Sequence, residues 1–489
     1  MKHLLLCFCV VLLVVAIVPD AGAQWQCLYA TYDDDACPSN NATGHNTFGV
    51  GVIKQDMFIA LVMTRGTRCF MIPYVNADST NGRRYSYGYG GSTAGIYQIW
   101  TDGAFDQVQM FNAFSIIATP DSFIYVANNN NPATNNDPAH NILVFKYVND
   151  TITVVAPYPR VETGSNGLYG LAVDASKRVY VCNDTTTGQT QDIRIYRPAA
   201  QWSPTHTETP LRTIDLPNGI YKGITVTPDG SNIFVCDYTN RRVLKYTGSV
   251  AAGYTLAPGF NFQLNDVFGI GGASVAKPIA LAYLSPNNIL AVACDSLFGG
   301  SAAYEYGRIY LVNPNNGNLV SADTSVNRID AAAWNFAVTG GYNLRSCGHG
   351  NASGYTSTYD VKFDENKNVY TQSNYGWTVD KWRYNGTLPV ITSVEEIRSV
   401  EPESYKLQQN YPNPFNPATS IEFAILKAGH VTLKVYDMLG KEVATLVDEE
   451  KTAGNYRVTF SAQDLASGTY CYTLRSGGYT EMKRMLVLK

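Results

Sequence analysis

The 489-residue sequence lacks the short motifs by which most catalytic sites are recognised. Its six histidines are scattered with no HxxxH or HxH pair, and neither a Gly-x-Ser-x-Gly elbow nor a Cys-x-x-Cys motif occurs. The glycine-rich stretches at 88–91 and 348–354 do not stand between a strand pattern and a helix pattern, so they predict loops rather than phosphate-binding turns. The sequence therefore offers no familiar metal, nucleophile, redox or nucleotide motif.

Charged residues are also scarce, at 16% of the chain, and the formal net charge is −4. Because no basic tract is present, we do not expect nucleic acid as a partner. Long amphipathic helical patterns are missing, whereas tyrosine (34) and glycine (41) are abundant. This composition is typical of an all-β extracellular protein, and the length indicates more than one domain.

The one long apolar run lies at the N-terminus. Lys2 precedes an apolar stretch from Leu4 to Val18, and Ala21-Gly22-Ala23 follows. This arrangement predicts a signal peptide over residues 1–23, with Ala21 and Ala23 as the small residues of the cleavage site. The run is too short to cross a bilayer as a helix, and we expect no transmembrane segment.

The body of the chain repeats. One sub-pattern is an apolar strand, a turn and a second strand with a small or polar end, at 115–129, 170–184, 223–238, 280–296, 360–374 and, more loosely, 49–64. A second sub-pattern follows each copy, at 95–100, 141–147, 192–198, 242–248, 308–314 and 378–384. Six ordered copies predict a six-bladed β-propeller, whereas a pair of β-sandwiches would not repeat in this way. We place it at 46–387, with residues 24–45 as a segment that closes the ring.

The C-terminal segment has a different pattern. Residues 410–417 read NYPNPFNP, and each proline there fixes its own backbone and favours an extended residue before it. Apolar residues then alternate over 420–426 and 430–436, which predicts half-buried strands of a small Ig-like β-sandwich at 410–489, after a linker at 388–409. The residues that define the motif are Asn410, Tyr411, Pro412, Asn413, Pro414, Phe415, Asn416, Pro417, Tyr436, Asp437 and Gly440.

On these residues the segment closely resembles the C-terminal sorting domain (type A) of proteins exported by the type IX secretion system. The resemblance implies the secretion machinery as a partner, transit through the periplasm, and a final place in the medium or attached to the outer-membrane surface. It also implies that the sorting domain is removed or exchanged for a lipid anchor. The strand pairs of the body resemble NHL and YVTN-type propellers, best at 228–237, and many unrelated activities share that architecture.

The cysteines of the body follow the repeat. Cys182, Cys236 and Cys294 fall at one point of consecutive copies, where equivalent positions lie too far apart for a disulfide. We therefore expect three buried thiols that act as small apolar residues. Cys27 and Cys37 flank a polar stretch near the mature N-terminus, and the sequence leaves open whether they pair.

Polar residues also recur where the second strand of each copy ends: Asn128, Asn183, Asp237, Asp295 and Asn374. One interpretation is that these side chains cap strand ends by bonding backbone N–H groups in turns. The alternative is that they gather at the central channel and hold a calcium ion, as in lactonase-type propellers. We favour capping, and no cofactor is predicted.

We infer the function from the absence of recognisable catalytic motifs in the sequence. The sequence favours a secreted or surface-displayed, non-catalytic propeller that works as a binding or scaffold module for an extracellular protein or glycan. Aromatic residues in the long segments between strand patterns suit such contacts: Tyr85, Tyr87, Tyr89, Trp202, Trp334, Tyr342, Tyr355 and Trp377. The alternative is a calcium-dependent hydrolase or lyase with its site at the central channel.

Overall fold

The computed structural model describes residues 25–32, 46–63, 69–77, 96–101, 104–110, 113–129, 141–154, 167–184, 191–202, 208–265, 267–268, 274–295, 308–321, 323–330, 358–373, 378–391, 394–398, 402–462 and 465–488. The predicted signal peptide, Cys37 and Asn374 lie outside these ranges, as do all the loop aromatics named above except Trp202. Among the described residues no helix combines the length and apolarity needed to cross a bilayer.

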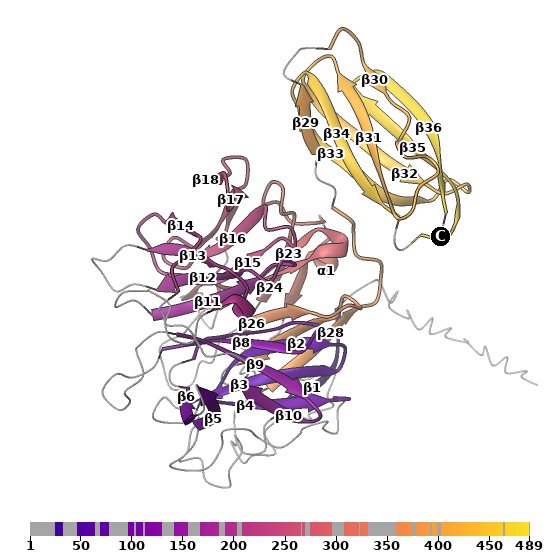
Figure 1. The fold of residues 1–489 in the computed structure, drawn as a ribbon. Helices are drawn as coiled ribbons and strands as arrows, with labels where there is room; N and C mark the ends of the chain where they lie inside the picture. The colour runs from indigo at the N-terminus through magenta and orange to yellow at the C-terminus, as the bar shows by residue number, and fades with distance from the viewer. Residues whose placement is uncertain are drawn as a thin grey trace, which may run out of the picture.

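The body is built from six small antiparallel sheets, the blades of the propeller (Figure 1). Blades 1 to 3 consist of β2 (Asn46–Lys54), β3 (Met57–Met63) and β4 (Cys69–Val75); β7 (Ser115–Ala118), β8 (Phe123–Asn128), β9 (Asn141–Val148) and β10 (Thr151–Val154); and β11 (Gly167–Val173), β12 (Val179–Asp184), β13 (Asp192–Tyr196) and β14 (Arg212–Asp215).

Blades 4 to 6 consist of β15 (Tyr221–Val226), β16 (Asn232–Asp237), β17 (Arg242–Ser249) and β18 (Gly253–Leu256); β22 (Lys277–Leu284), β23 (Ile289–Asp295), β24 (Arg308–Val312) and β25 (Arg328–Asp330); and β26 (Thr358–Phe363), β27 (Val369–Ser373), β28 (Thr378–Tyr384) and β1 (Trp25–Tyr32). The short strand β19 (Phe262–Gln263) pairs with β17 and adds to blade 4. The remaining elements are β5 (Ile96–Thr101), β6 (Ala104–Gln109), β20 (Val267–Phe268), β21 (Ser274–Val275), the short 3-10 turns η2 (Ala199–Gln201) and η3 (Ser285–Asn287), and α1 (Thr324–Asn327).

The first strands of the blades form a closed ring. β2, β7, β11, β15, β22 and β26 contact one another in that order, and β26 returns to β2. The six-bladed prediction is therefore confirmed. β1 runs antiparallel to β28, with Trp25 opposite Tyr384, so the N-terminal strand completes the last blade. This pairing ties the two ends of the propeller together.

One copy of the second sub-pattern is misplaced. Residues 95–100 were expected to supply the third strand of blade 1, but β5 pairs with β6 in a separate hairpin, and β4 is the third strand of that blade. The reason is that apolar alternation marks any strand and does not identify its neighbour.

Three first strands carry a glycine where they approach the next first strand: Gly49, Gly170 and Gly223. A Cβ atom added at Gly223 of β15 would lie 2.6 Å from the Cα atom of Ala280 in β22 and 2.7 Å from the carbonyl oxygen of Ile279. Both distances are shorter than van der Waals contact, so the two backbones are in direct contact across the seam between blades 4 and 5. The recurring glycine of the repeat is thus explained by close backbone packing.

The alignment of the cysteines was wrong at one position. Gly170 pairs with Cys182, and Gly223 with its neighbour Lys222 stands opposite Cys236, but the equivalent Ala280 pairs with Ala293. Cys294 is therefore one residue further along its strand, in the position of Asp237. The turns of the two copies differ: Pro286 in η3 stands one residue later in its turn than Pro228 does, so an alignment of the two sequences by their prolines shifts Cys294 by one residue. All three cysteines are buried thiols, as predicted.

The C-terminal body is a sandwich of two four-stranded sheets with its own core. One sheet has the order β29-β34-β31-β30 and the other β33-β32-β35-β36. The core consists of apolar residues from both sheets, such as Val431, Leu433 and Val458. The strands are β29 (Val394–Arg398), β30 (Lys406–Leu407), β31 (Ala418–Ile425), β32 (Gly429–Tyr436), β33 (Glu442–Lys451), β34 (Gly454–Ser461), β35 (Gly468–Ser476) and β36 (Tyr479–Val487).

The range predicted as a linker, 388–409, is largely structured. β29 lies within it and pairs with β34 of the sandwich. Upstream, the Asn287 side chain donates hydrogen bonds to the carbonyl oxygens of Leu388 and Pro389 at 3.2 and 3.0 Å, and Leu388 is buried in the propeller core. The charged sequence VEEIR suggested a linker, but its backbone completes a sheet.

Candidate functional site

The polar residues at the ends of the second strands do not form one cluster in the described structure. The second strands lie behind the first strands, which form the inner ring. Asn128 and Asp237 are buried, the side chains of Asn183 and Asp295 lie outside the description, and so does Asn374 entirely. By register, Asp295 matches the residue after Asp237 rather than Asp237 itself. Successive residues of a strand point to opposite faces, so a one-residue offset separates such side chains.

Asp237 behaves as a strand cap. Its Oδ1 atom accepts hydrogen bonds from the backbone N–H and the side-chain amide of Asn240, at 3.1 and 3.0 Å. Its Oδ2 atom accepts one from Arg242 Nε at 2.9 Å. Because a guanidinium already neutralises this carboxylate, the arrangement does not fit a calcium ligand. Within the described ranges, no group of three or more His, Cys, Asp or Glu residues is placed to hold a metal.

A different set of residues surrounds the mouth of the channel. Four first strands have a one-residue β-bulge near their N-terminal end, at Phe48, Tyr169, Ile279 and Tyr359. In β15, Lys222 and Gly223 together stand opposite the single residue Cys236. Phe114 precedes β7 at the equivalent place. Bulges re-aim side chains, and their repetition gives one ring of six positions at one end of the ring of strands.

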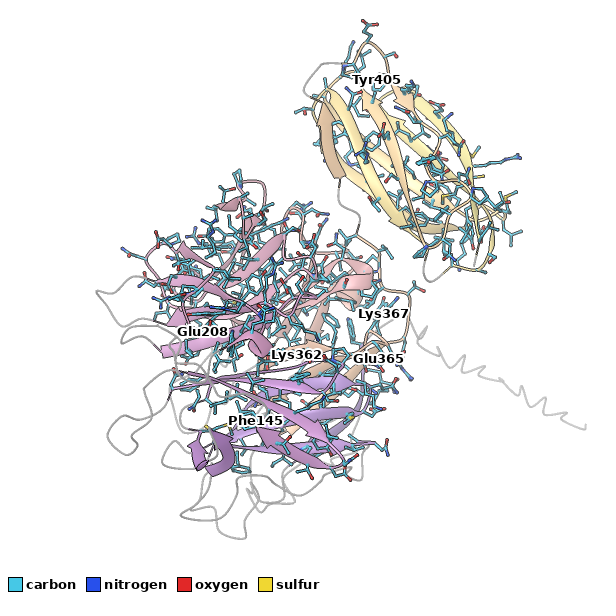
Figure 2. The ribbon with its side chains drawn as sticks, in the orientation of Figure 1. Phe145, Glu208, Lys362, Glu365, Lys367 and Tyr405 are labelled. Carbon is cyan, nitrogen blue, oxygen red and sulfur yellow. The ribbon has the colours of Figure 1, made fainter. Side chains whose placement is uncertain are left out.

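The described cavity at this place is small. It measures about 40 Å³ and is bordered by five of the six first strands, or by the residue that precedes them. The polar and aromatic residues that line it are Phe114, Ser115, Tyr169, Lys222, Asp360 and Lys362. Figure 2 shows Lys362 in the middle of the propeller, whereas Glu365 and Lys367 of the following turn lie at its edge. The cavity is thus the central channel itself.

Lys222 lies among aromatic rings. Its Nζ atom is 4.6 Å from the ring centroid of Tyr169 and 4.4 Å from that of Tyr238, and it donates a 3.3 Å hydrogen bond to the Tyr169 hydroxyl. Tyr169 also stacks on Phe114 with centroids 4.8 Å apart. On the other side, Lys277 Nζ lies 4.5 Å from the Tyr238 centroid. Rings and ammonium groups therefore alternate across three blades, an arrangement that cation–π attraction stabilises.

Asp360, the carboxylate that lines this cavity, makes hydrogen bonds and an ion pair within the fold. Asp360 is buried, and its Oδ2 atom accepts a 3.0 Å hydrogen bond from the backbone N–H of Val50 in blade 1. Its Oδ1 atom accepts from its neighbour Val361 at 2.9 Å and pairs with the ammonium group of Lys362. Asp360 thus joins the last blade to the first.

A larger cavity, of about 330 Å³, lies between the strand turns of blades 4 and 5. Its polar groups stabilise those turns: the Thr227 hydroxyl donates to Asp229 at 2.6 Å, and the Tyr283 hydroxyl donates to Asn288, also at 2.6 Å. Lys245 borders the same space and donates to the carbonyl oxygen of Pro314 at 2.9 Å. These bonds account for the turns that border the cavity.

Sequence reasoning missed Lys222. The repeats were compared at the ends of their second strands, where every candidate residue recurs. Comparing the residue before the small residue of each first strand would have shown one lysine among aromatic and aliphatic residues. Trp202, which was expected in an exposed loop, is instead buried, and its indole N–H donates to the carbonyl oxygen of Arg197 at 2.8 Å.

The proline-rich motif forms part of the sandwich. Asn410 is buried, its backbone N–H donates to the Tyr472 hydroxyl at 2.8 Å, and its side-chain amide donates to the Thr419 hydroxyl at 3.0 Å and to the Pro412 carbonyl oxygen at 3.1 Å. Burial raises the pKa of Tyr472 to about 12, so this hydroxyl stays protonated at neutral pH.

The same motif covers an edge strand. Phe415 is buried in the core, and its backbone exchanges 3.0 Å hydrogen bonds with Leu486 and Leu488 at the free edge of β36. The Asn413 side chain accepts a further bond from the Leu486 N–H at 2.8 Å. An uncovered edge invites pairing with other chains, and this run satisfies part of it.

The other motif residues form a turn. Asp437 Oδ1 accepts hydrogen bonds from the backbone N–H groups of Leu439 and Lys441, both at 2.9 Å. Gly440 has a φ of +83°, which glycine adopts without strain. Tyr436 ends β32, opposite Cys471 of β35.

Residues 409–488 match a family model described as "Secretion system C-terminal sorting domain". The chain ends in a type IX sorting domain. The domain implies export through the type IX machinery, to the extracellular or cell-surface side. No curated protein matches the chain.

Several solved structures are similar in fold. A protein of unknown function from Bacteroides thetaiotaomicron is 12% identical, with a TM-score of 0.42 over 74% of this chain and 75% of that one. The β-propeller domain of Myceliophteria thermophila Cps50 (Swd1) is 9% identical, with a TM-score of 0.38 over 69% and 96%. A streptogramin B lyase is 10% identical, with a TM-score of 0.31 over 70% and 97%.

Proposed function

We propose that this protein is a secreted or surface-displayed propeller that acts as a non-catalytic binding module, with its ligand site at the mouth of the central channel. The observation that carries the proposal is that Phe114, Tyr169 and Lys222, from three consecutive blades, line the cavity of the central channel together. Aromatic rings at such a place offer flat surface for a sugar ring or a protein side chain.

The charged residues at the mouth support binding over hydrolysis. A hydrolase needs a group that can take or give a proton, but Asp360 is occupied by the Val50 N–H and by Lys362. Likewise, Asp237, the central residue of the calcium alternative, is neutralised by Arg242. Neither carboxylate is left to activate water.

The proposal is tested on the full mature chain. We expect no turnover on a panel of lactones, esters and glycosides, with or without added calcium. We also expect that Tyr169→Ala abolishes binding of any glycan or peptide captured by the wild type. Turnover that Asp237→Ala removes would contradict the non-catalytic assignment, and a ligand unaffected by Tyr169→Ala would place the site elsewhere.

A further inference from the structure

We infer that the cavity between the turns of blades 4 and 5 binds the carboxylate of a small hydroxylated acid, such as a uronic acid, through Lys245 of β17. This site is separate from the channel mouth, so the inference goes beyond the proposed function. It is carried by a comparison of this seam with the seam between blades 6 and 1, where an equivalent lysine has a carboxylate partner.

Lys245 and Lys381 occupy equivalent positions in the third strands of blades 4 and 6. Lys245 lies opposite Phe234 of β16, and Lys381 lies opposite Tyr370 of β27. Both aromatic residues stand two positions before the residue that faces the irregularity of the first strand. The ammonium groups lie 5.6 Å from the ring centroid of Phe234 and 5.7 Å from that of Tyr370. The two lysines therefore reach the same place in their blades.

At the seam between blades 6 and 1, the lysine has an anionic partner. Lys381 Nζ lies 2.6 Å from Asp56 Oδ1, in the first turn of blade 1, and Lys381 is only 2% exposed. The Tyr370 hydroxyl accepts a 2.8 Å hydrogen bond from the Asp56 N–H and donates one at 3.2 Å to Asp364, in the turn of blade 6. Two carboxylates and a hydroxyl group thus occupy this seam, and the charge of Lys381 is neutralised.

The seam between blades 4 and 5 lacks these groups. Asn288 is the counterpart of Asp56, because each ends its turn directly before the second strand, with φ of +52° and +56°. Phe234 lacks the hydroxyl group of its counterpart, and by register Thr227 stands where Asp364 stands in blade 6. The lysine is therefore kept while both carboxylates are replaced by uncharged groups.

Among the described residues, Lys245 has no carboxylate partner. Its Nζ atom donates a 2.9 Å hydrogen bond to the carbonyl oxygen of Pro314, which leaves further N–H groups for a ligand. Burial lowers the pKa of Lys245 to about 8, as expected for an ammonium group that has lost water without gaining an anion. Asp229 also borders the cavity, but its Oδ1 atom accepts hydrogen bonds from Thr227 and Ser231 of its own turn.

The size and lining of the cavity indicate the rest of the ligand. Its volume of about 330 Å³ lies at the lower end of the range of small-molecule sites, which begins at about 300 Å³. Ser231, Asn232 and Ser285 are among the polar residues that line it. These groups suit a ligand that carries hydroxyl groups besides its carboxylate. The carboxylate would take the place that Asp56 holds beside Lys381 at the other seam.

The experiment is calorimetric titration of the full mature chain with glucuronate, and with glucose as the matched uncharged probe. We expect glucuronate to bind roughly tenfold or more tightly than glucose, because a hydrogen bond between charged groups is gained. Only the protonated amine attracts a carboxylate. With a pKa of about 8 for Lys245, glucuronate should therefore bind roughly tenfold more weakly at pH 9 than at pH 7.

The other titratable groups of the described lining do not change charge in this range. Burial raises the pKa of Tyr283 to about 12, so its hydroxyl stays protonated. Burial acts to raise the pKa of Asp229, but the hydrogen bonds from Thr227 and Ser231 outweigh it and the pKa is lowered, so this carboxyl stays ionised. The change in affinity between pH 7 and pH 9 therefore reports Lys245.

Two variants test the comparison of the seams. Asn288→Asp places a carboxylate where Asp56 stands beside Lys381, so it should pair with Lys245 and weaken glucuronate binding by roughly tenfold or more. Lys245→Met should abolish the preference for glucuronate over glucose.

Lys146→Gln is the matched control. Lys146 also lies in a third strand over a phenylalanine ring, 4.9 Å from the centroid of Phe123, but it does not line this cavity. This variant should leave the affinity for glucuronate unchanged. Thermal unfolding of each variant checks that it folds.

The outcomes that overturn the inference are distinct from those that test the channel mouth. Equal affinity for glucuronate and glucose, no binding of glucuronate, or full affinity in Asn288→Asp or Lys245→Met would each refute it. A constant affinity from pH 7 to pH 9 would refute it as well, and that measurement needs no variant, so it stands even if a variant fails to fold. None of these results bears on the proposed binding site at the channel mouth, which Tyr169→Ala tests separately.

Discussion

The seam between blades 4 and 5 should respond to a single methyl group. In Gly223→Ala, the new Cβ would lie 2.6 Å from the Cα atom of Ala280 and 2.7 Å from the carbonyl oxygen of Ile279. Carbon atoms in contact lie about 3.5–4.0 Å apart, so β15 and β22 must separate by about 1 Å. Both obstacles are backbone atoms, which a rotamer change cannot move.

The expected change in the free energy of unfolding follows from two opposing effects of the substitution. Overpacking a well-packed core costs about 1–3 kcal/mol. Replacing glycine by alanine restricts the unfolded chain and returns roughly 0.4–1 kcal/mol. Gly223→Ala should therefore lower the free energy of unfolding of the propeller by about 1–2 kcal/mol.

The assay can be confined to the propeller. All six tryptophans precede residue 388, so their fluorescence in a urea titration reports the propeller and not the sandwich. Gly259→Ala is the matched control, because its Cβ would meet nothing within 4 Å. It should leave the midpoint unchanged or raise it slightly. If the two variants unfold at the same urea concentration, the two first strands are not in backbone contact and the reasoning is wrong.

Three further predictions concern other parts of the molecule. Asn410→Ala should destabilise the sandwich by about 1–3 kcal/mol, because it leaves buried partners unsatisfied, and hydrogen exchange of β31 and β34 should show the loss. Burial lowers the pKa of Lys245 to about 8, so the folded state binds fewer protons than the unfolded chain from about pH 8 to its unfolded pKa near 10.4. Over that window, stability relative to Lys245→Met should rise with pH, and a flat difference in urea midpoint would contradict it. Deleting 405–489 should leave β29 in the chain without its partner strand, whereas deleting 394–489 removes β29 as well. Both truncated chains should keep a folded propeller, measured by tryptophan fluorescence, and both should fail to reach the medium.

The repeat in the sequence was enough to predict the propeller because blade strands are buried on both faces. Sequences such as NIFVCD in β16 are buried at five of six positions, so each blade leaves a continuous apolar run between turn residues. The closing strand β1 was also placed correctly by position, since a ring must join its ends. The hairpin of β5 and β6 shows the limit, because the same signal arises outside a blade.

The sandwich boundary was harder to predict because edge strands need little apolar sequence. β29 has the sequence VEEIR, which shows no clear periodic signal, and it pairs through its backbone with β34. The proline-rich motif was interpreted as a stiff connector, and the structure adds that its backbone also covers β36. A connector and an edge cover have the same local sequence, and only the partner strand distinguishes them.

The channel mouth could not be predicted because strict alternation hides a bulge. A bulge adds one residue to a strand, so a period-2 pattern assigns every residue before it to the wrong face. Tyr169 and Lys222 lie just before the repeat copies at 170–184 and 223–238, so neither was compared between blades, and the search for a site turned to the second strands. The offset of Cys294 has a different origin, because it arises from one residue of slip in the turn before β23. A comparison of equivalent first-strand positions escapes this difficulty, because it asks which blade differs from the others and needs no assignment of faces.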